Sequence, residues 1–337
     1  MRHKYTKVLY THKAEGSQPQ LVIADNENLQ SKFVVQKVLE LREQNIPLNE
    51  MAVLFRSSFH SSDLEIELAK ANIPFLKFGG FKFVETAHIK DMAAYFHVLD
   101  NPRDVVAWNR ILLLIDGVGP RTAEKIIDDI LQHGVGQSFP TFWEKYNSYP
   151  QNVKELFHLL KSIAAERIPP AEKVARIITY YHPIFKHRYD DHVKRRKDLD
   201  AFEQIASRYE DIGSLLADLA LEPPNESVVD LTSPGDEDEH LILSTIHSAK
   251  GLEWHSVFLI YALDGRFPSS RSAGSVDEME EERRLMYVAC TRAKENLFIT
   301  YPVNIYDRES GMVLSKPSRF LDGLNEKLLE PWVIGEE

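Results

Sequence analysis

The residues best suited to chemistry in this 337-residue chain are gathered in the stretch Ser244–Trp254, S-T-I-H-S-A-K-G-L-E-W. Apolar runs at Leu241–Leu243 and Val257–Leu263 predict a strand on each side of it. An α/β protein places its ligands at the carboxyl ends of its strands, although on composition alone an ordinary loop between two buried strands explains the stretch equally well. The candidate ligand-binding residues within it are Thr245, His247, Lys250, Gly251 and Glu253.

A second candidate is Arg292, at the end of an expected helix. The capping box Ser275–Glu278 and a run of acids in the first turns predict where this helix begins. An arginine just before the next strand can point out of the domain at a ligand held by another body, because its planar fork meets phosphate oxygens and keeps its charge. The alternative is an i, i+4 pair with the acids of the helix. We prefer that alternative for Arg283 and Arg284, whereas for Arg292 the two interpretations are close.

The elements that must position these residues form a nested pattern. Alternating strands and helices open the chain, with Ser62 and Glu65 suited to a capping box at the second helix. This β-α-β-α-β order indicates a parallel sheet covered by helices. The expected strands are Leu21–Ala24, Met51–Phe55 and Ile73–Phe78, and the expected helices are Asn28–Gln44 and one from about Ser61 to Asn72.

From Thr86 to Ala220 almost every segment has helical periodicity, and strand-like sequence returns at Leu241 and again at Leu297–Tyr301. Because the α/β pattern opens and closes the chain, we expect an α/β domain of residues 1–86 and 240–337 interrupted by an all-α domain of residues 87–239, which ends in an acidic linker. The expected helices of this insertion are Ala87–Leu99, Val105–Leu114, Thr122–His133, Val153–Ala165, Ala171–Tyr181 and about His192 to Tyr209.

Composition excludes several classes of protein. The chain has no signal pattern and no apolar run long enough to span a bilayer, so we expect a cytoplasmic protein with no membrane partner. One cysteine, Cys290, excludes an internal disulfide and a C-x-x-C zinc site, and we expect it to be a small buried residue and no metal to be bound. The net charge of −11 argues against a basic coat but allows a basic groove.

Three linked motifs resemble those of one family. The Thr245–Trp254 stretch, D-G-R-F-P at Asp264–Pro268 and E-E-E-R-R-L-M-Y-V-A-C-T-R-A-K at Glu280–Lys294 are similar, in order and spacing, to motifs V and VI of the UvrD/PcrA/Rep superfamily 1 DNA helicases. A-V-L-F-R-S-S, A-N-I-P-F, G-G-F-K-F-V-E and I-K-D, between residues 52 and 91, resemble the segment that leads into that family's insertion. Two residues depart from the family pattern: Trp254 stands where a Phe is common, and Phe55 stands where a Tyr is common.

The resemblance implies the second of two RecA-like bodies. The chain has no G-x-x-x-x-G-K-[ST] phosphate loop, nor any Gly-Lys dipeptide. It is therefore expected to be the C-terminal half of a helicase, inactive as an ATPase by itself, whose ATP and Mg²⁺ are bound mainly by an N-terminal RecA-like domain.

The resemblance also assigns roles to residues. Arg292 matches the motif VI arginine that reaches the γ-phosphate, and Glu253, with Gly251 beside it, matches the acid at the nucleotide. Thr245 and His247 match positions that face single-stranded DNA, and Lys250 either pairs with phosphate or is solvated. Arg56 and Ser57 resemble another strand-contacting segment, although a structural role at the end of a strand suits them as well.

In the insertion, the family resemblance implies that the stretch I-D-G-V-G-P-R-T-A contacts the duplex at the junction, much as helix-hairpin-helix elements contact DNA. Its backbone N–H groups before a helix can hold a phosphate, although a tight turn explains the isolated pattern slightly better. The candidate residues are Gly117, Gly119, Arg121 and Thr122. The basic stretch Lys186–Lys197 is a weaker candidate for the same role.

The leading hypothesis is thus part of an ATP-dependent, 3′→5′ DNA helicase or translocase, in which polarity follows only from the resemblance. Two alternatives stay open: a DNA-binding module without a motor, and the helicase body of a helicase–nuclease complex. The model in which ATP lies in a cleft requires Arg292 and Glu253 to share one open face at the carboxyl edge of the sheet.

Overall fold

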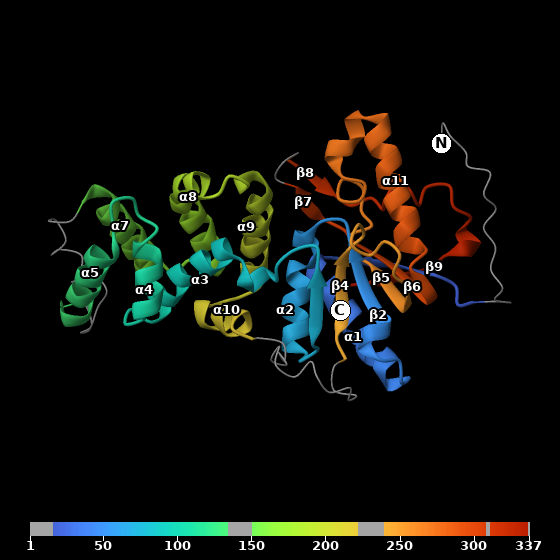
Figure 1. The fold of residues 1–337 in the computed structure, drawn as a ribbon, viewed down its shortest axis with the longest axis horizontal. Helices are drawn as coiled ribbons and strands as arrows, with labels where there is room; N and C mark the ends of the chain where they lie inside the picture. The colour runs from blue at the N-terminus through green and yellow to red at the C-terminus, as the bar shows by residue number, and fades with distance from the viewer. Residues whose placement is uncertain (1–15, 134–149, 222–238, 308–310, 336–337) are drawn as a thin grey trace. The chain divides into compact units, whose positions relative to one another are not determined.

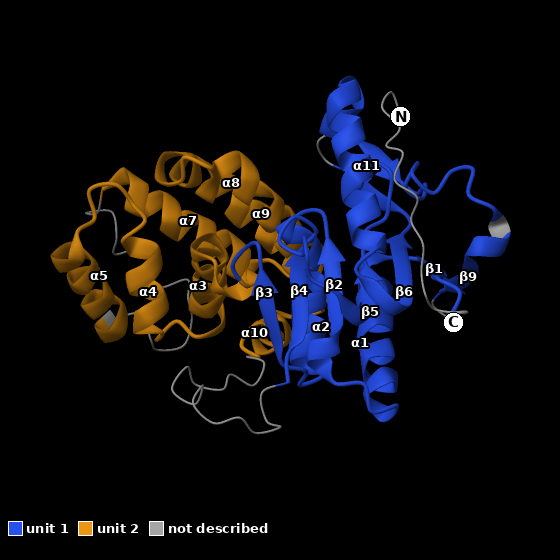
Figure 2. Ribbon diagram, turned by 45° about the vertical axis from the view of Figure 1, so that its right-hand side comes forward, with its two compact units in different colours: residues 1–81, 222–337 blue, residues 82–221 orange. Residues whose placement is uncertain are grey.

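A computed structural model describes residues 16–133, 150–221, 239–307 and 311–335 (Figure 1). The chain divides into two compact units: an α/β unit of residues 1–81 and 222–337, and a helical unit of residues 82–221 (Figure 2). The sequence-based boundaries at residues 86 and 240 differ from these, and most of the expected acidic linker lies outside the described residues.

The α/β unit is built on one seven-stranded sheet with the order β3-β4-β2-β5-β6-β1-β9, and every pairing in it is parallel. The predicted fold class, a parallel sheet covered by helices, is confirmed. The strands are β1 Gln20–Ala24, β2 Met51–Phe55, β3 Phe75–Phe78, β4 Leu241–Thr245, β5 Trp254–Leu259, β6 Ala293–Pro302 and β9 Glu330–Ile334.

Two apolar layers cover this sheet. On one face α1 (Glu27–Glu43) and α2 (Ser62–Lys70) pack on strand residues that include Val53 and Phe55. On the other face α11 (Val276–Cys290) and residues 246–253 pack on Ala52 and Leu54. Side chains alternate between the faces of a strand, so β2, buried along its whole length, reads as a continuous apolar run. This is the pattern expected of a central parallel strand.

Some local predictions were wrong. The strand after the polar loop begins at Trp254, three residues earlier than expected, because Trp254 is buried in the layer beneath α11. No capping hydrogen bond is made by a side chain at the start of α2. The Ser61 hydroxyl instead lies 2.7 Å from the Glu65 carboxylate, which also pairs with Lys77. Glu65, the acid that a capping box would use, is therefore engaged in a buried ion pair with Lys77.

Short and exposed elements were not predicted. These include the edge strand β9, whose side chains are almost all exposed and which lacks the apolar alternation that marks a strand. The strand β6 is also longer than expected, because it begins directly after Arg292. Other missed elements include α10 (Ile212–Leu219) and the hairpin of β7 (Ile305–Asp307) and β8 (Met312–Leu314).

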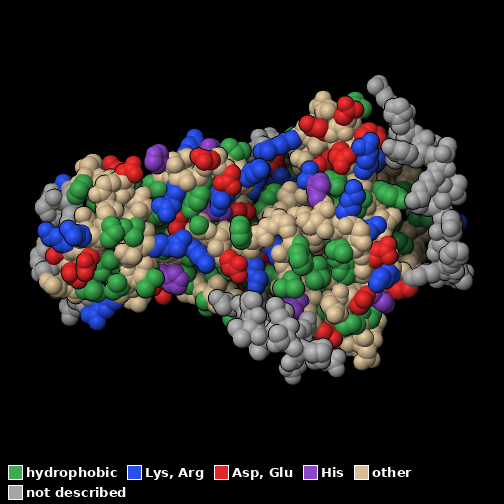
Figure 3. All heavy atoms as spheres, in the orientation of Figure 1, with side chains coloured by type: hydrophobic (Ala, Val, Ile, Leu, Met, Phe, Trp, Pro, Cys, Tyr) green, Lys and Arg blue, Asp and Glu red, His purple; other side chains and the backbone are tan. Residues whose placement is uncertain are grey.

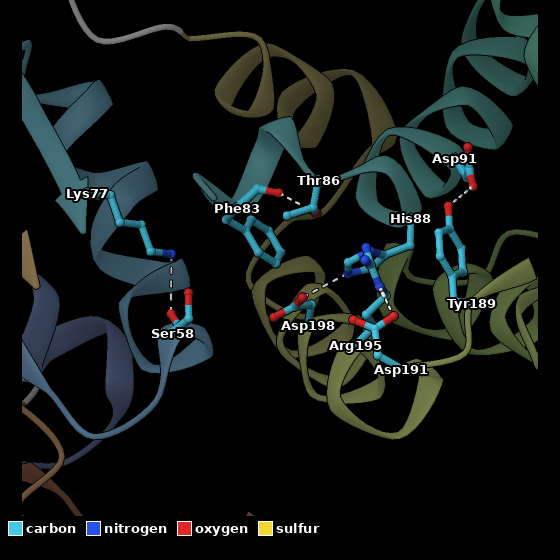
Figure 4. Close-up of polar contacts among 10 residues, drawn as sticks. All are labelled: Ser58, Lys77, Phe83, Thr86, His88, Asp91, Tyr189, Asp191, Arg195 and Asp198. Carbon is cyan, nitrogen blue, oxygen red and sulfur yellow. Dashed lines mark hydrogen bonds and ion pairs between the residues drawn. The ribbon is translucent and has the colours of Figure 1, made fainter. Parts of the chain in front are cut away.

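The helical unit is organised around a buried carboxylate, Asp91. Its oxygens accept hydrogen bonds from Arg110 at 2.7 Å, Tyr181 at 2.5 Å and Tyr189 at 3.2 Å, and Figure 4 shows the last of these. Such a charge needs these partners because unpaired burial is costly. The helices are α3 Ala87–Asp100, α4 Val105–Leu112, α5 Pro120–His133, α7 Gln151–Ala165, α8 Pro170–Arg188, α9 His192–Ala206 and α10.

The helix α8 continues seven residues past its expected end at Tyr181, through Pro183, because Phe185 in its last turns is buried. No helix in the described part of the chain is long and apolar enough to cross a bilayer. Among the described residues, no group of three His, Cys, Asp or Glu side chains could hold a metal ion.

Candidate functional site

At the carboxyl edge of the sheet, Thr245 ends β4 beside the end of β2 at Phe55. The backbone N–H of Ile246 donates to the Phe55 carbonyl, which holds the polar loop against β2. The Thr245 hydroxyl donates to Ser248 Oγ at 3.0 Å, and His247 is exposed beside it. Both candidate DNA-contacting residues therefore lie at the edge where the sequence placed them.

The end of β3 packs tightly against this loop. A Cβ on Gly79 would lie 2.4 Å from Thr245 Oγ1, and the Gly79 φ of +85° also favours glycine. A Cβ on Gly80 would lie 2.3 Å from Ser58 Oγ. The sequence indicated this Gly-Gly pair only as part of a family segment; its spatial role, bringing the β3 backbone onto Thr245, depends on contacts distant in the chain.

A buried ion pair supports the same edge. Lys77 Nζ lies 2.6 Å from Glu65 Oε1 and donates to the Ser58 carbonyl at 3.4 Å, as Figure 4 shows for the second contact. Both charged side chains are almost fully buried, so the pair holds the segment after β2 in place and offers no free cation. Single-sequence reasoning missed it because Lys77 and Glu65 stand on different elements.

Arg56 follows β2 at this edge, but its guanidinium faces the protein. Its Nε and Nη2 atoms both lie 2.7 Å from Glu282 Oε1, and Glu282, on α11, is only 2% exposed. The Ser269 backbone N–H donates to the second oxygen of Glu282 at 3.4 Å. These contacts favour the structural alternative for Arg56, whereas half-buried Ser57 makes no side-chain hydrogen bond at the turn that it begins.

Glu253 and Arg292 lie at the opposite, amino edge of the sheet. Glu253 directly precedes β5 and Arg292 directly precedes β6, and the backbone N–H of Trp254 donates to the Arg292 carbonyl at 2.9 Å. The two residues thus share one edge, but it is the amino edge, so the model that places ATP in a cleft at the carboxyl edge was wrong. Parallel strands all start at one edge, so a residue just before a strand cannot lie where the strands end.

Hydrogen bonds hold the Arg292 guanidinium in one orientation. Nε donates to the Val288 carbonyl at 3.1 Å, Nη1 to the Leu252 carbonyl at 2.7 Å and Nη2 to Thr291 Oγ1 at 3.1 Å. The Val288 carbonyl belongs to the last turn of α11, where the helix dipole favours a cation. A guanidinium has five N–H donors, so two are left for a ligand, and no carboxylate among the described residues pairs with Arg292.

Residues 246–253 connect the two edges along the face covered by α11. Gly251 has a φ of +87°, which favours glycine at this turn. Lys250 and Glu253 are exposed, and neither side chain bonds to another described residue. One short segment therefore begins beside Thr245 and ends beside Arg292.

The two preceding arginines of α11 pair with acids of their own helix. Arg283 lies 2.8 Å from Glu280 and Arg284 lies 2.9 Å from Glu281, at a spacing of three residues where four was expected. Cys290, about two turns further along the helix, is half-buried among apolar residues where a buried residue was expected, and burial raises the pKa of its thiol to about 11. The thiol is therefore almost wholly protonated at neutral pH, as expected for a residue that does no chemistry.

In the helical unit, Gly117 has a φ of +80° and α5 begins at Pro120, two residues earlier than predicted. The side chains of Arg121 and Thr122 are exposed on its first turn. The backbone N–H groups of Gly119, Arg121 and Thr122 meet no acceptor among the described residues, as the first turn of a helix allows. The Asn152 side chain donates to the Asp116 carbonyl at 2.7 Å and holds this turn against α7.

This arrangement of motifs on a parallel sheet has counterparts among known proteins. Residues 1–304 match the model of the UvrD-like helicase C-terminal domain. The chain belongs to this family. The match covers the whole helical unit, the α/β unit as far as residue 304, and all of the motif residues between Arg56 and Arg292.

Similar curated proteins include a probable DNA helicase II homolog of Mycoplasma capricolum, 32% identical over 96% of this chain and 46% of that protein. The ATP-dependent DNA helicase PcrA of Staphylococcus epidermidis is 30% identical, with the same shares covered. PcrA of Staphylococcus aureus is 29% identical over those shares. The chain thus spans about half the length of the curated relatives it matches and is similar to the C-terminal half of such a helicase.

Proposed function

We propose that this UvrD-like chain is the second motor body of an ATP-dependent DNA helicase or translocase, together with its helical insertion. The observation that carries the proposal is the separation of the motif residues between two edges of one sheet. Thr245 and His247 lie at the carboxyl edge and Glu253 and Arg292 at the amino edge, and residues 246–253 join them. Separated sites joined by one segment suit a machine that couples nucleotide hydrolysis to movement along DNA.

The nucleotide, ATP with Mg²⁺, would be bound between the amino edge and an N-terminal RecA-like domain that carries the phosphate loop. Two N–H donors of Arg292 meet no acceptor among the described residues and suit a phosphate, and the exposed carboxylate of Glu253 suits a ribose hydroxyl. Arg292 would act as an arginine finger by neutralising charge on the transferred phosphoryl group. By itself the chain would hydrolyse no ATP.

Single-stranded DNA would cross the carboxyl edge, where hydroxyl and imidazole groups contact phosphates or stack on bases without sequence preference. The exposed side chain of His247 and the Thr245 hydroxyl support this path; Ser57 follows β2 at the same edge, and exposed Lys250 lies further along residues 246–253. In the helical unit, the turn at Gly117 and the first turn of α5 would contact the duplex at the junction. Polarity 3′→5′ is proposed from the family alone.

The decisive experiment measures ATP hydrolysis, with and without single-stranded DNA, by this chain joined to its N-terminal RecA-like domain. Arg292→Ala is expected to lower kcat about 10³-fold or more. Arg292→Lys is expected to recover little of that kcat, because the lysine ammonium lacks the planar, two-pronged guanidinium. The matched control is Arg284→Ala, on the same helix and paired only with exposed Glu281. Unchanged hydrolysis in folded Arg292→Ala would rule out the arginine finger.

The same protein separates the rival functions. Thr245→Val with His247→Ala is expected to weaken the stimulation of hydrolysis by DNA while leaving basal hydrolysis unchanged. If the joined protein binds DNA but hydrolyses no ATP, the chain is a DNA-binding module without a motor. DNA cleavage that depends on a segment after Glu337 would instead indicate a helicase–nuclease complex.

A further inference from the structure

The tip of the hairpin formed by α8 and α9 carries a local charge opposite to that of the whole chain. Within residues 182–197, six Lys and Arg side chains stand against two Asp, a formal charge of +4 in a chain whose total is −11. Three histidines lie in the same stretch: His182, His187 and His192. Figure 3 shows Lys, Arg and His side chains, with some acids among them, where α8 and α9 reach the visible surface.

Helix stability explains only half of this charge. Lys186, His187 and Arg188 end α8, where cations meet the negative end of the helix dipole favourably. The cations of α9 stand in its first two turns, and its first turn contains no acid. There the dipole disfavours cations, so these residues cost stability unless they meet an anion. They are Lys194, Arg195, Arg196 and Lys197.

Some of these cations are neutralised inside the unit. Arg195 lies 2.6 Å from Asp191, and Arg196 lies 3.1 Å from Asp200 (Figure 4 shows the first two residues). Lys186, Arg188 and Lys194 are exposed, and no carboxylate among the described residues pairs with them. Three solvent-facing cations are thus left within the last turn of one helix and the first turn of the next.

Side chains from both helices converge beside these three. The pKa of His182 is lowered, first by burial and then by the positive charges of Lys186, Arg196 and His192. His182 and Lys186 are four residues apart on α8, and His192 and Arg196 are four apart on α9, so each pair lies along one face of its helix. The charge is therefore shared across the hairpin and does not belong to one helix alone.

We propose that the tip of the α8–α9 hairpin is a binding site for the phosphate backbone of duplex DNA, separate from the turn at Gly117. Lys186, Arg188 and Lys194 contact the phosphates directly through their side chains. Contacts of this kind position DNA without reading its sequence. The inference rests on the proposed function only in taking DNA as the ligand.

The test measures binding of the 337-residue chain to a labelled duplex of about 20 base pairs by fluorescence anisotropy, as a function of KCl concentration. The triple variant Lys186→Gln, Arg188→Gln, Lys194→Gln is compared with a control triple of equal charge change, Lys90→Gln, Lys161→Gln, Arg167→Gln. All six residues are exposed and on or next to helices. Gln keeps a good helix propensity, so both variants are expected to fold, which circular dichroism checks.

The hairpin variant is expected to bind duplex about tenfold or more weakly at low salt. The slope of log K against log salt should become shallower by about 2.7, which is 0.9 for each lost phosphate contact. The control should leave the slope within about 0.5 of the unmodified chain. Equal losses in both variants, or an unchanged slope in the hairpin variant, would overturn the site.

Two further results separate this inference from others. Loss of binding to phosphatidylserine vesicles in the hairpin variant, with duplex binding unchanged, would make the tip a membrane site and overturn the proposal. The ATPase result for Arg292→Ala is independent of this measurement, because it concerns the other unit. The motor proposal can thus be refuted while the hairpin proposal is upheld, and the hairpin proposal can be refuted while the motor proposal is upheld.

Discussion

The ion pair between Arg56 and Glu282 joins the segment after β2 to α11 and offers a quantitative test of the site's construction. Glu282 is 2% exposed and the Arg56 side chain is 27% exposed, so solvent screens the pair only partly. In Arg56→Met, the buried carboxylate keeps only the 3.4 Å bond from the Ser269 N–H. Removing one partner of a buried pair costs about 3–5 kcal/mol, and the partial exposure of Arg56 places the expected loss near the lower limit, about 3 kcal/mol.

The assay is native-state hydrogen exchange at the amides of β2 and α11, which reports the free energy of opening of the α/β unit separately from the helical unit. Arg56→Met/Glu282→Leu should be less destabilised than the sum of the single variants by about 2 kcal/mol, since it leaves no unpaired charge. The control Arg284→Met, which breaks an exposed pair, should cost less than about 0.5 kcal/mol. A loss in Arg56→Met as small as the control's, or additive losses, would refute the reasoning.

Two other predictions follow from local geometry. Gly79→Ala should destabilise the α/β unit by about 2–3 kcal/mol, because its Cβ meets Thr245 Oγ1; Gly117→Ala, with an equally positive φ but open space, should cost the helical unit only about 1 kcal/mol. Urea unfolding checks both, and equal losses would contradict the close contact. The pKa of the Cys290 thiol is raised to about 11 from an ordinary value of 9.0. The thiol should therefore react with Ellman's reagent at pH 8 about a hundredfold more slowly in the folded chain than in the denatured chain, and the reaction should become faster as the pH rises. Equal rates in the folded and denatured chains would show an accessible thiolate.

Two elements connect the edges of the sheet at which the motif residues lie, and both can transmit a movement from one edge to the other. Residues 246–253 and α11 lie on the same face of the sheet, and Arg292 bonds to both through the Leu252 and Val288 carbonyls. A shift of Arg292 towards a phosphate would therefore pull on both elements. One of them begins at Thr245, and the other is held by Arg56, so each element links the amino edge to the proposed DNA edge.

Much of the secondary structure could be predicted because its signals are local. The apolar run Met51–Phe55 predicted β2 with the correct bounds, and the box at Ser275 predicted the start of α11, where the Ser275 hydroxyl accepts from the Glu278 N–H at 3.3 Å. Motif spacing pointed to the family that the comparisons then confirmed. The short exposed strand β9 failed the same reasoning because it has no buried face to impose a period.

What the sequence by itself determined is therefore the set of elements, their nested order and the chemical character of the motif residues, since these depend on local periodicity and side-chain type. Only the tertiary structure decided which edge each residue occupies and which partner holds it. The edge of Glu253 depends on where β5 begins and on its parallel direction. The partner of Arg56 stands 226 residues away, and such a distant contact is set by the packing of α11 on the sheet, which no local pattern encodes.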